Sequence, residues 1–178
     1  MGNNPPKNGL NRVQKAYKID SSLVNPLGML PRTAAKGIRS LAERNLKRGM
    51  SMGLPSGQDV ARYMDIIPFQ DKDLRVGKAT EEDAQKNPLV TQISKAFAGN
   101  APLWYYVLAE AQQQFQKNDT AIMLGAVGGR IVAEVFIGLL LGDSHSFLSQ
   151  VPSWKPEPAF MTNGKFGMAE LIKEARQA

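Results

Sequence analysis

Few residues of this chain could perform chemistry, since the sequence contains one histidine and no cysteine. The lack of cysteine excludes disulfides, thiolate metal sites and cysteine nucleophiles. His145 follows Asp143 and Ser144, so the residue types of a serine-hydrolase triad are adjacent. The chain has no G-x-S-x-G turn to present a nucleophilic serine, and one histidine offers a metal ion a single ligand. We therefore interpret His145 as a local hydrogen-bonding residue at a helix end, and predict no catalytic residue and no metal ligand.

Asn45 is a polar residue that the helical pattern of residues 35–49 places among apolar ones. At about 100° per residue, one face of this predicted helix holds Ile38, Leu41, Ala42, Asn45 and Gly49. Arg48 falls on the edge of that face, and Arg44 points away from it. On the outer face, Glu43 precedes Lys47 at the i,i+4 spacing that favours an ion pair. A buried amide needs hydrogen-bond partners. The residues alone leave two interpretations open: a core asparagine bonded to nearby backbone, or an asparagine that orients another functional residue.

Helices are expected to position these residues, because no segment shows sustained alternation of apolar and polar residues. Ser56 is a good N-cap for a short helix over 57–64, and Pro102 suits the first turn of a helix that ends near residue 117. The other predicted helices are one opened by Thr80 and Asp83, and those over 89–97, 121–141, 145–150 and 168–176. The predicted fold class is all-α.

The N-terminal residues 1–35 have no helical periodicity and contain four prolines. Prolines at this density favour extended backbone and turns. We therefore predict an extended arm over residues 1–35 and a helical part over residues 36–178.

The longest apolar segment, 121–141, is long enough to span a membrane. Arg130 and Glu134 interrupt it, and a central arginine costs roughly 2.5–3.5 kcal/mol on insertion. Its five glycines, up to position 142, suit close packing between helices. We therefore predict a central buried helix and no transmembrane span. These glycines lack the G-x-G-x-x-G spacing and the preceding strand of a phosphate-binding loop.

The net charge of +6 is scattered along the chain, without a run of five like charges. This distribution predicts no nucleic-acid partner. Residues 1–20 are polar and lack the apolar core of a secretory signal, so we expect none in this chain. Two compartments remain as alternatives: the cytoplasm, or secretion through a signal that belongs to a missing N-terminal half.

Two runs of sequence resemble the animal haem peroxidases, the peroxidase–cyclooxygenase superfamily. Residues 41–57 read LAERNLKRGMSMGLPSG, which resembles the family motif L-x-x-x-N-x-x-R-G-R-D-H-G-L-P-x-x. Residues 124–140, LGAVGGRIVAEVFIGLL, look like the bacterial branch of the family, and the segments 104–106 and 147–156 fit the same branch. The resemblance extends from about residue 10 to residue 178 and covers only the C-terminal part of the family's catalytic domain.

The resemblance implies roles for three residues of the predicted helix. In the family, an asparagine accepts the second N–H of the proximal histidine that binds haem iron, and Asn45 matches that position. Arg48 matches an arginine that binds a haem propionate, a contact that suits a planar guanidinium. Leu41 is expected to line the haem pocket. The implied cofactor is haem b, and its iron ligand is not in this chain, because the family's proximal and distal histidines precede the motif whereas His145 follows it.

The implied function is that of a haem-dependent peroxidase, which reduces hydrogen peroxide and oxidises an organic or halide donor, as in a response to oxidative stress. The chain would be the proximal-side C-terminal portion, with an N-terminal peroxidase half as its partner. It departs from the motif at residues 50–52, where Met-Ser-Met replaces Arg-Asp-His. The alternatives are a non-catalytic helical remnant or interaction protein without haem, a fragment of a fatty-acid dioxygenase-type haem enzyme, and a membrane-surface protein that uses the 121–141 helix.

Overall fold

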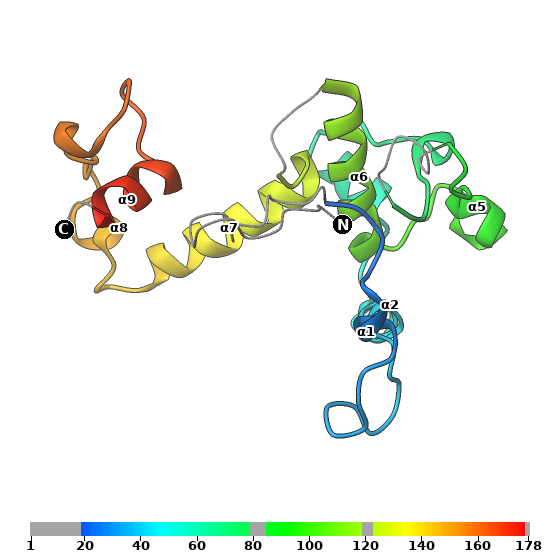
Figure 1. Cartoon of the computed structure of the whole chain (residues 1–178). Coiled ribbons are helices and arrows are strands. Elements are labelled where there is room, and N and C mark those ends of the chain that lie inside the picture. Colours follow the sequence, from blue (N-terminus) through cyan, green and yellow to red (C-terminus); the bar gives the residue numbers. More distant parts are fainter. Residues whose placement is uncertain (1–18, 79–84, 119–122, 177–178) are drawn as a thin grey trace, which may run out of the picture. The chain divides into compact units, whose positions relative to one another are not determined.

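The computed structural model describes residues 19–78, 85–118 and 123–176 (Figure 1). These residues form helices and loops and no strand, apart from isolated bridges such as the one between Ser56 and Pro102. The predicted all-α class is confirmed for this part of the chain. The elements, in order, are α1 (Asn25–Gly28), α2 (Leu41–Ser51), α3 (Gly57–Tyr63), η1 (Asp71–Asp73), α5 (Val90–Ile93), η2 (Lys95–Phe97), α6 (Leu103–Asn118), α7 (Ala126–Gly142), α8 (Phe147–Gln150), η3 (Pro158–Phe160) and α9 (Met168–Ala175).

Several helices begin where the sequence predicts them. The Ser56 hydroxyl accepts the Asp59 N–H at 3.1 Å and caps α3, and α6 begins directly after Pro102. The predicted helix over 89–97 is divided into α5 and η2 because Ser94 between them has extended backbone. The helix predicted over 145–150 begins later, at Phe147, because Ser146 is its N-cap and accepts the Ser149 N–H with its hydroxyl. The helix predicted from Thr80 and Asp83 lies outside the described residues.

α2 begins later than the periodicity of residues 35–49 predicts, and that part of the prediction is wrong. Ser40 is the N-cap of α2, and the residues before it form a loop. Leu30 donates its N–H to the Arg39 carbonyl at 3.0 Å, and Arg39 Nε donates to the Leu30 carbonyl at 2.7 Å. These two bonds tie residue 39 to residue 30, so the backbone there is not available for a helix.

Residues 19–35, the described part of the predicted arm, contain α1, which has Pro26 in its single turn, and a turn in which the Ala34 and Ala35 N–H groups donate to the Pro31 carbonyl. The prediction of an extended arm therefore holds only between these turns. The Ser21 hydroxyl accepts the Gly77 N–H at 2.9 Å, from 56 positions further along the chain. The arm is therefore attached to the helical part, although its boundary after residue 35 stays a prediction.

The chain divides into two compact units, Met1–Val132 and Ala133–Ala178. The hydrophobic core lies in the first unit, and its buried members are Ala61, Leu74, Val90, Ala101, Tyr105, Tyr106, Ala109 and Val127. Six of these residues come from α3, α5, α6 and the first turn of α7, whereas Leu74 follows η1 and Ala101 lies in the loop before α6. In the second unit, Ser146 is the one buried residue among those that the structure describes.

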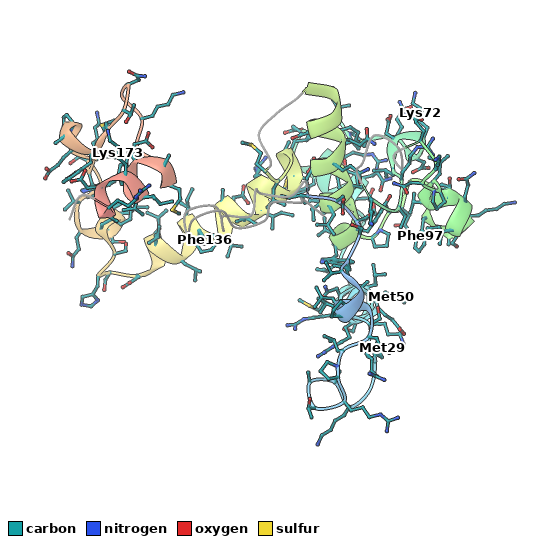
Figure 2. All side chains as sticks on the ribbon, viewed as in Figure 1. Met29, Met50, Lys72, Phe97, Phe136 and Lys173 are labelled. Carbon is teal, nitrogen blue, oxygen red and sulfur yellow. The ribbon has the colours of Figure 1, made fainter. Side chains whose placement is uncertain are left out.

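The sequence predicts a central buried helix over 121–141; a helix forms there, but the prediction that it is buried is wrong. α7 buries Val127 and Gly128 in its first turn, whereas from residue 132 to residue 139 every residue is exposed. Phe136, labelled in Figure 2, is 63% exposed and Leu139 is 66% exposed. The reason is that only the start of α7, up to the half-buried Ile131, packs against the core of the first unit. None of the described helices is long and apolar enough to cross a membrane, as expected.

Candidate functional site

α2 presents one half-buried face and one exposed face. Leu41, Ala42 and Asn45 are half-buried, whereas Arg44 is exposed, as the helical pattern predicts. Asn45 is therefore less deeply buried than a core residue, since no residue of α2 is fully buried. Arg48, expected at the edge of the inner face, is exposed.

The polar side chains of α2 differ in their partners. Lys47 and Glu43 form the expected ion pair on the outer face, with Nζ and Oε1 3.0 Å apart. Within the described residues, the Asn45 amide and the Arg48 guanidinium make no hydrogen bond or ion pair. The described part of the structure therefore does not support the first of the two interpretations, in which Asn45 is hydrogen-bonded to nearby backbone.

The turn after α2 is a glycine-terminated C-cap. Gly53 has a φ of 63°, a left-handed conformation that glycine adopts without a Cβ penalty. Its N–H donates to the Met50 carbonyl, and the Leu54 N–H donates to the Gly49 carbonyl, both at 3.0 Å. Met50 and Met52, in the positions where the family motif has charged residues, are 81% and 62% exposed. The turn therefore closes through backbone bonds and glycine conformation.

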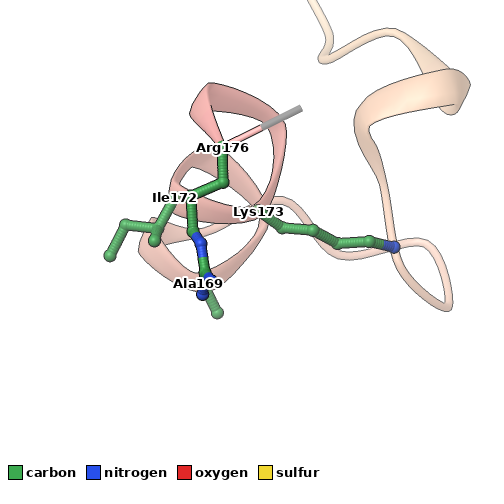
Figure 3. A pocket seen from close by; sticks show the side chains of 4 residues that line it. All are labelled: Ala169, Ile172, Lys173 and Arg176. Carbon is green, nitrogen blue, oxygen red and sulfur yellow. The ribbon is translucent and has the colours of Figure 1, made fainter. Parts of the chain in front are cut away.

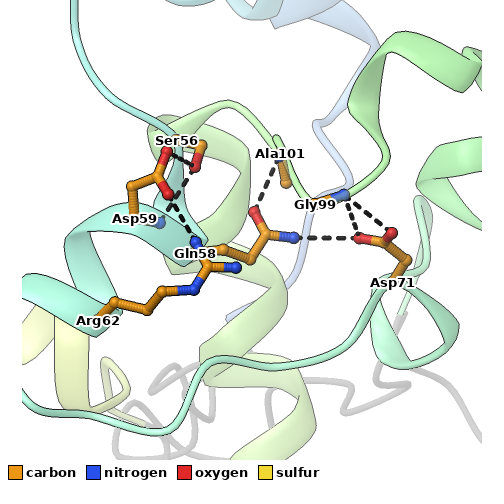
Figure 4. A network of polar contacts seen from close by, with 7 residues as sticks. All are labelled: Ser56, Gln58, Asp59, Arg62, Asp71, Gly99 and Ala101. Carbon is orange, nitrogen blue, oxygen red and sulfur yellow. Dashed lines mark hydrogen bonds and ion pairs between the residues drawn. The ribbon is translucent and has the colours of Figure 1, made fainter.

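A buried polar network fixes α3 directly after this turn (Figure 4). The Gln58 side chain, 2% exposed, accepts the Ala101 N–H at 2.9 Å and donates to Asp71 Oδ1 at 3.1 Å. The Asp71 carboxylate also accepts the Gly99 N–H, at 2.9 Å to Oδ2. One side chain thus joins the start of α3 to η1 and to the loop before α6. The sequence does not reveal this network, because its members are far apart along the chain.

α3 and α6 approach each other closely at Gly57. A Cβ added to Gly57 would lie 2.0 Å from Cγ and 2.1 Å from Cβ of Tyr106. Tyr106 is fully buried, and its hydroxyl accepts the Phe69 N–H at 3.0 Å. Burial raises the pKa of this phenol, which therefore stays neutral at physiological pH. Only glycine allows the two helices to pack at this distance.

Glu110 is a buried ionisable residue that the sequence analysis missed. It is 1% exposed, and its carboxylate accepts the N–H groups of Val127 and Gly128. Burial raises the pKa of Glu110, and the two backbone N–H groups oppose that shift. The signal in the sequence is its spacing, since Glu110 falls one turn after Tyr106 on the packed side of α6.

Two other polar atoms of α6 are buried without a hydrogen-bond partner in the described part of the chain. They are the Tyr105 hydroxyl and Oε1 of Gln112. Burial raises the pKa of the Tyr105 phenol. Seven positions separate the two residues, so they lie on the same side of the helix two turns apart.

His145 lies on an exposed loop and lacks the geometry of a triad. Ser144 Oγ is 3.3 Å and Asp143 Oδ1 is 3.7 Å from the same ring nitrogen, Nδ1. A triad needs the serine on one ring nitrogen and the carboxylate on the other. The interpretation of His145 as a residue with local contacts is consistent with this geometry, and its side chain is 88% exposed.

The remaining candidate surfaces offer little for chemistry. A hollow on α9 is lined by Ala169, Ile172 and Lys173 of that helix and by Arg176, the residue that follows it (Figure 3). Among the described residues, no three His, Cys, Asp or Glu side chains converge as metal ligands would. Comparisons of the chain with known protein families, curated proteins and solved structures found no match.

Proposed function

We propose that this chain is the proximal-side C-terminal portion of a haem-dependent peroxidase. The observation that supports this function best is the position of Asn45 on the half-buried face of α2, with an amide not engaged by any described residue. The amide oxygen is available to accept an N–H from another polypeptide. Leu41 precedes it by one turn on the same face, and Arg48 follows it at the edge.

Each of these residues fits one part of a haem. The Asn45 oxygen would accept the second ring N–H of a histidine supplied by the N-terminal half, which fixes the imidazole and raises its basicity. The exposed guanidinium of Arg48 suits a propionate carboxylate. Leu41 would form part of the apolar wall. Bound haem b would supply the iron chemistry that reduces hydrogen peroxide and oxidises an organic or halide donor.

The second unit supports the proposal that the chain is incomplete by itself. From residue 133 on, the described part buries no apolar side chain, although Phe147 and Trp154 stack edge to face with ring centroids 4.9 Å apart. A unit without an apolar core does not offset the conformational entropy lost on ordering its chain. Contact with an N-terminal peroxidase half would cover this surface.

Haem binding with an added ligand tests the role of Asn45 directly. The purified chain is titrated with hemin in the presence of imidazole, which replaces the missing histidine, and the Soret band is followed. We expect Asn45→Ala to weaken hemin binding roughly 10- to 100-fold, the usual effect of removing a partner of a metal ligand. Arg48→Ala should weaken it through the lost charge-assisted bond to a propionate. Arg44→Ala, on the exposed face of the same helix, is the matched control and should bind as the wild type does.

The same titration is repeated with a co-expressed upstream half that bears the histidine. A Soret band that does not depend on Asn45, or no band in either arrangement, would contradict the proposal. Two assays on the assembled pair separate the two chemistries. Oxidation of a phenolic donor by hydrogen peroxide reports peroxidase activity, and oxygen uptake with a fatty acid reports dioxygenase activity.

The second candidate function is a helical interaction protein without haem. The exposed apolar side chains of α7, such as Val135 and Phe136, favour it, because such a surface marks a binding site for a protein or a membrane surface. This candidate predicts no hemin uptake with any partner. Flotation with liposomes would detect the membrane-surface variant of it.

A further inference from the structure

The second unit exposes most of its large apolar side chains. On α9, Met168, Leu171 and Ile172 follow one another at i, i+3 and i+4, so they lie on one side of the helix, and all three are exposed. On α7, residues 135–141 include no ionisable side chain, and Phe136 is exposed (Figure 2). An amphipathic helix with its apolar side in solvent, together with an uncovered apolar helix, indicates a binding surface.

The exposed apolar area of this unit is large enough for a stable dimer. Thirteen large apolar side chains of its described residues are 41–69% exposed. Since a side chain of this size presents roughly 150–250 Å² at full exposure, they offer roughly 1,300 Å² in each copy. A standard specific interface takes about 800 Å² from each partner, and monomeric proteins rarely expose a contiguous apolar patch above a few hundred Å². The unit therefore exposes more apolar surface than one such interface needs.

The charge distribution favours a second copy of the same unit as the occupant. Residues 133–178 contain four Lys or Arg and five Asp or Glu, a net charge of −1, so residues 1–132 carry +7 of the total of +6. Two copies of the second unit can therefore meet without the like-charge repulsion that two first units would experience. An anionic partner, such as a nucleic acid or an acidic membrane, would be attracted to the first unit instead.

We propose that the chain forms a two-fold dimer through its second unit, in which the apolar side of α9 in one copy packs on residues 135–141 of α7 in the other. Two-fold symmetry repeats this contact, so both helices are covered in both copies and the assembly closes at two chains. The dimer gives the second unit the apolar core that one copy lacks. It goes beyond the proposed peroxidase role and does not depend on haem. An N-terminal half that covers the same surface would have to displace the second copy.

Sedimentation of the full chain tests the proposal. Interfaces of this area have dissociation constants of roughly micromolar or below, so at about 50 µM the wild type should sediment with twice the chain mass of 19.5 kDa. Ile172→Glu should weaken the dimer by more than about 30-fold, because two-fold symmetry places the charge in the interface twice. The matched control is Lys173→Gln, which changes the net charge equally. Lys173 points away from Ile172 (Figure 3), so this variant should dimerise as the wild type does.

Crosslinking tests which helices meet, and it needs no charged substitution. The chain contains no cysteine, so an introduced thiol is unique. Phe136→Cys protein is mixed with Ile172→Cys protein and treated with a short bismaleimide, and mass spectrometry should find residue 136 of one chain linked to residue 172 of another. Lys173→Cys in place of Ile172→Cys should give little of this product. All three positions are exposed, so this experiment decides the matter if Ile172→Glu does not fold.

Several results would overturn the proposal. They are a wild type that stays monomeric at the highest concentration, a dimer that Ile172→Glu does not weaken, and equal crosslinking through residues 172 and 173. A mass that keeps rising with concentration would show open-ended association instead of a closed pair. A monomer that binds liposomes or the upstream half through Ile172 would assign the surface to that partner. The hemin titration of Asn45 is a separate measurement, so failure of the dimer and failure of the proposed function are distinguishable.

Discussion

Replacing Gly57 by alanine should destabilise the first unit more than the small change in volume suggests. The added Cβ would meet Cβ of Tyr106 at 2.1 Å, more than 1 Å short of the 3.4 Å at which ordinary contact begins. Cβ of Tyr106 is attached to the backbone of α6, so a rotamer change cannot relieve the clash. α3 and α6 must separate, which strains the bond from the Gly57 N–H to the Ala101 carbonyl at 2.9 Å.

Overpacking of a tight core costs about 1–3 kcal/mol, and a strained backbone hydrogen bond adds about 1 kcal/mol. We therefore expect Gly57→Ala to lower the free energy of unfolding by about 3 kcal/mol. Urea unfolding would measure it in a Trp154→Phe background, so that fluorescence reports Trp104 of α6 as the one remaining tryptophan.

The matched control is Gly49→Ala on α2. There an added Cβ has its nearest neighbour, Cδ1 of Leu54, at an ordinary 3.7 Å. Alanine is favoured over glycine in a helix by about 0.5–1 kcal/mol, so this variant should be neutral or slightly more stable. If Gly57→Ala unfolds at the same urea concentration as Gly49→Ala, the close packing of α3 on α6 is refuted.

Two further substitutions test the elements that follow α2. Gln58→Leu should lower the free energy of unfolding by roughly 2–3 kcal/mol, because it leaves the buried Ala101 N–H without its acceptor and removes a donor to Asp71. The same urea titration measures this loss. A variant as stable as the wild type would show that the network contributes nothing to stability. Ser56→Ala should cost about 1–2 kcal/mol through the lost cap of α3, and Ser56→Asp, which keeps an acceptor, should recover part of it.

The predictions that succeeded from sequence concern interactions between residues close together in the chain. The face of α2 that holds Asn45, the Glu43–Lys47 pair and the capping of α3 by Ser56 follow from helical spacing and from side chains within four positions. The same reasoning placed the start of α6 after Pro102. These features require no knowledge of where other segments lie.

The errors and the omissions concern contacts between distant segments. Residues 35–39 have a helical pattern, but the bonds between Arg39 and Leu30 hold them in a loop. The apolar composition of 121–141 predicts burial, yet only the start of α7, up to Ile131, packs against the core of the first unit. An apolar composition shows that a segment favours burial, but only the packing of the helices decides whether other segments of this chain bury it.

The sequence by itself therefore determined the helical class of the described residues, the bounds of α3, α6 and α9, and which side of α2 presents Asn45, because local periodicity and capping fix these. The tertiary structure decided the capping of α7 by Glu110 from 17 positions earlier and the bridging of Ala101 by Gln58 across 43 positions. Such contacts depend on how helices approach one another, and glycines at positions 57 and 125 set that approach by admitting a side chain where a Cβ would not fit.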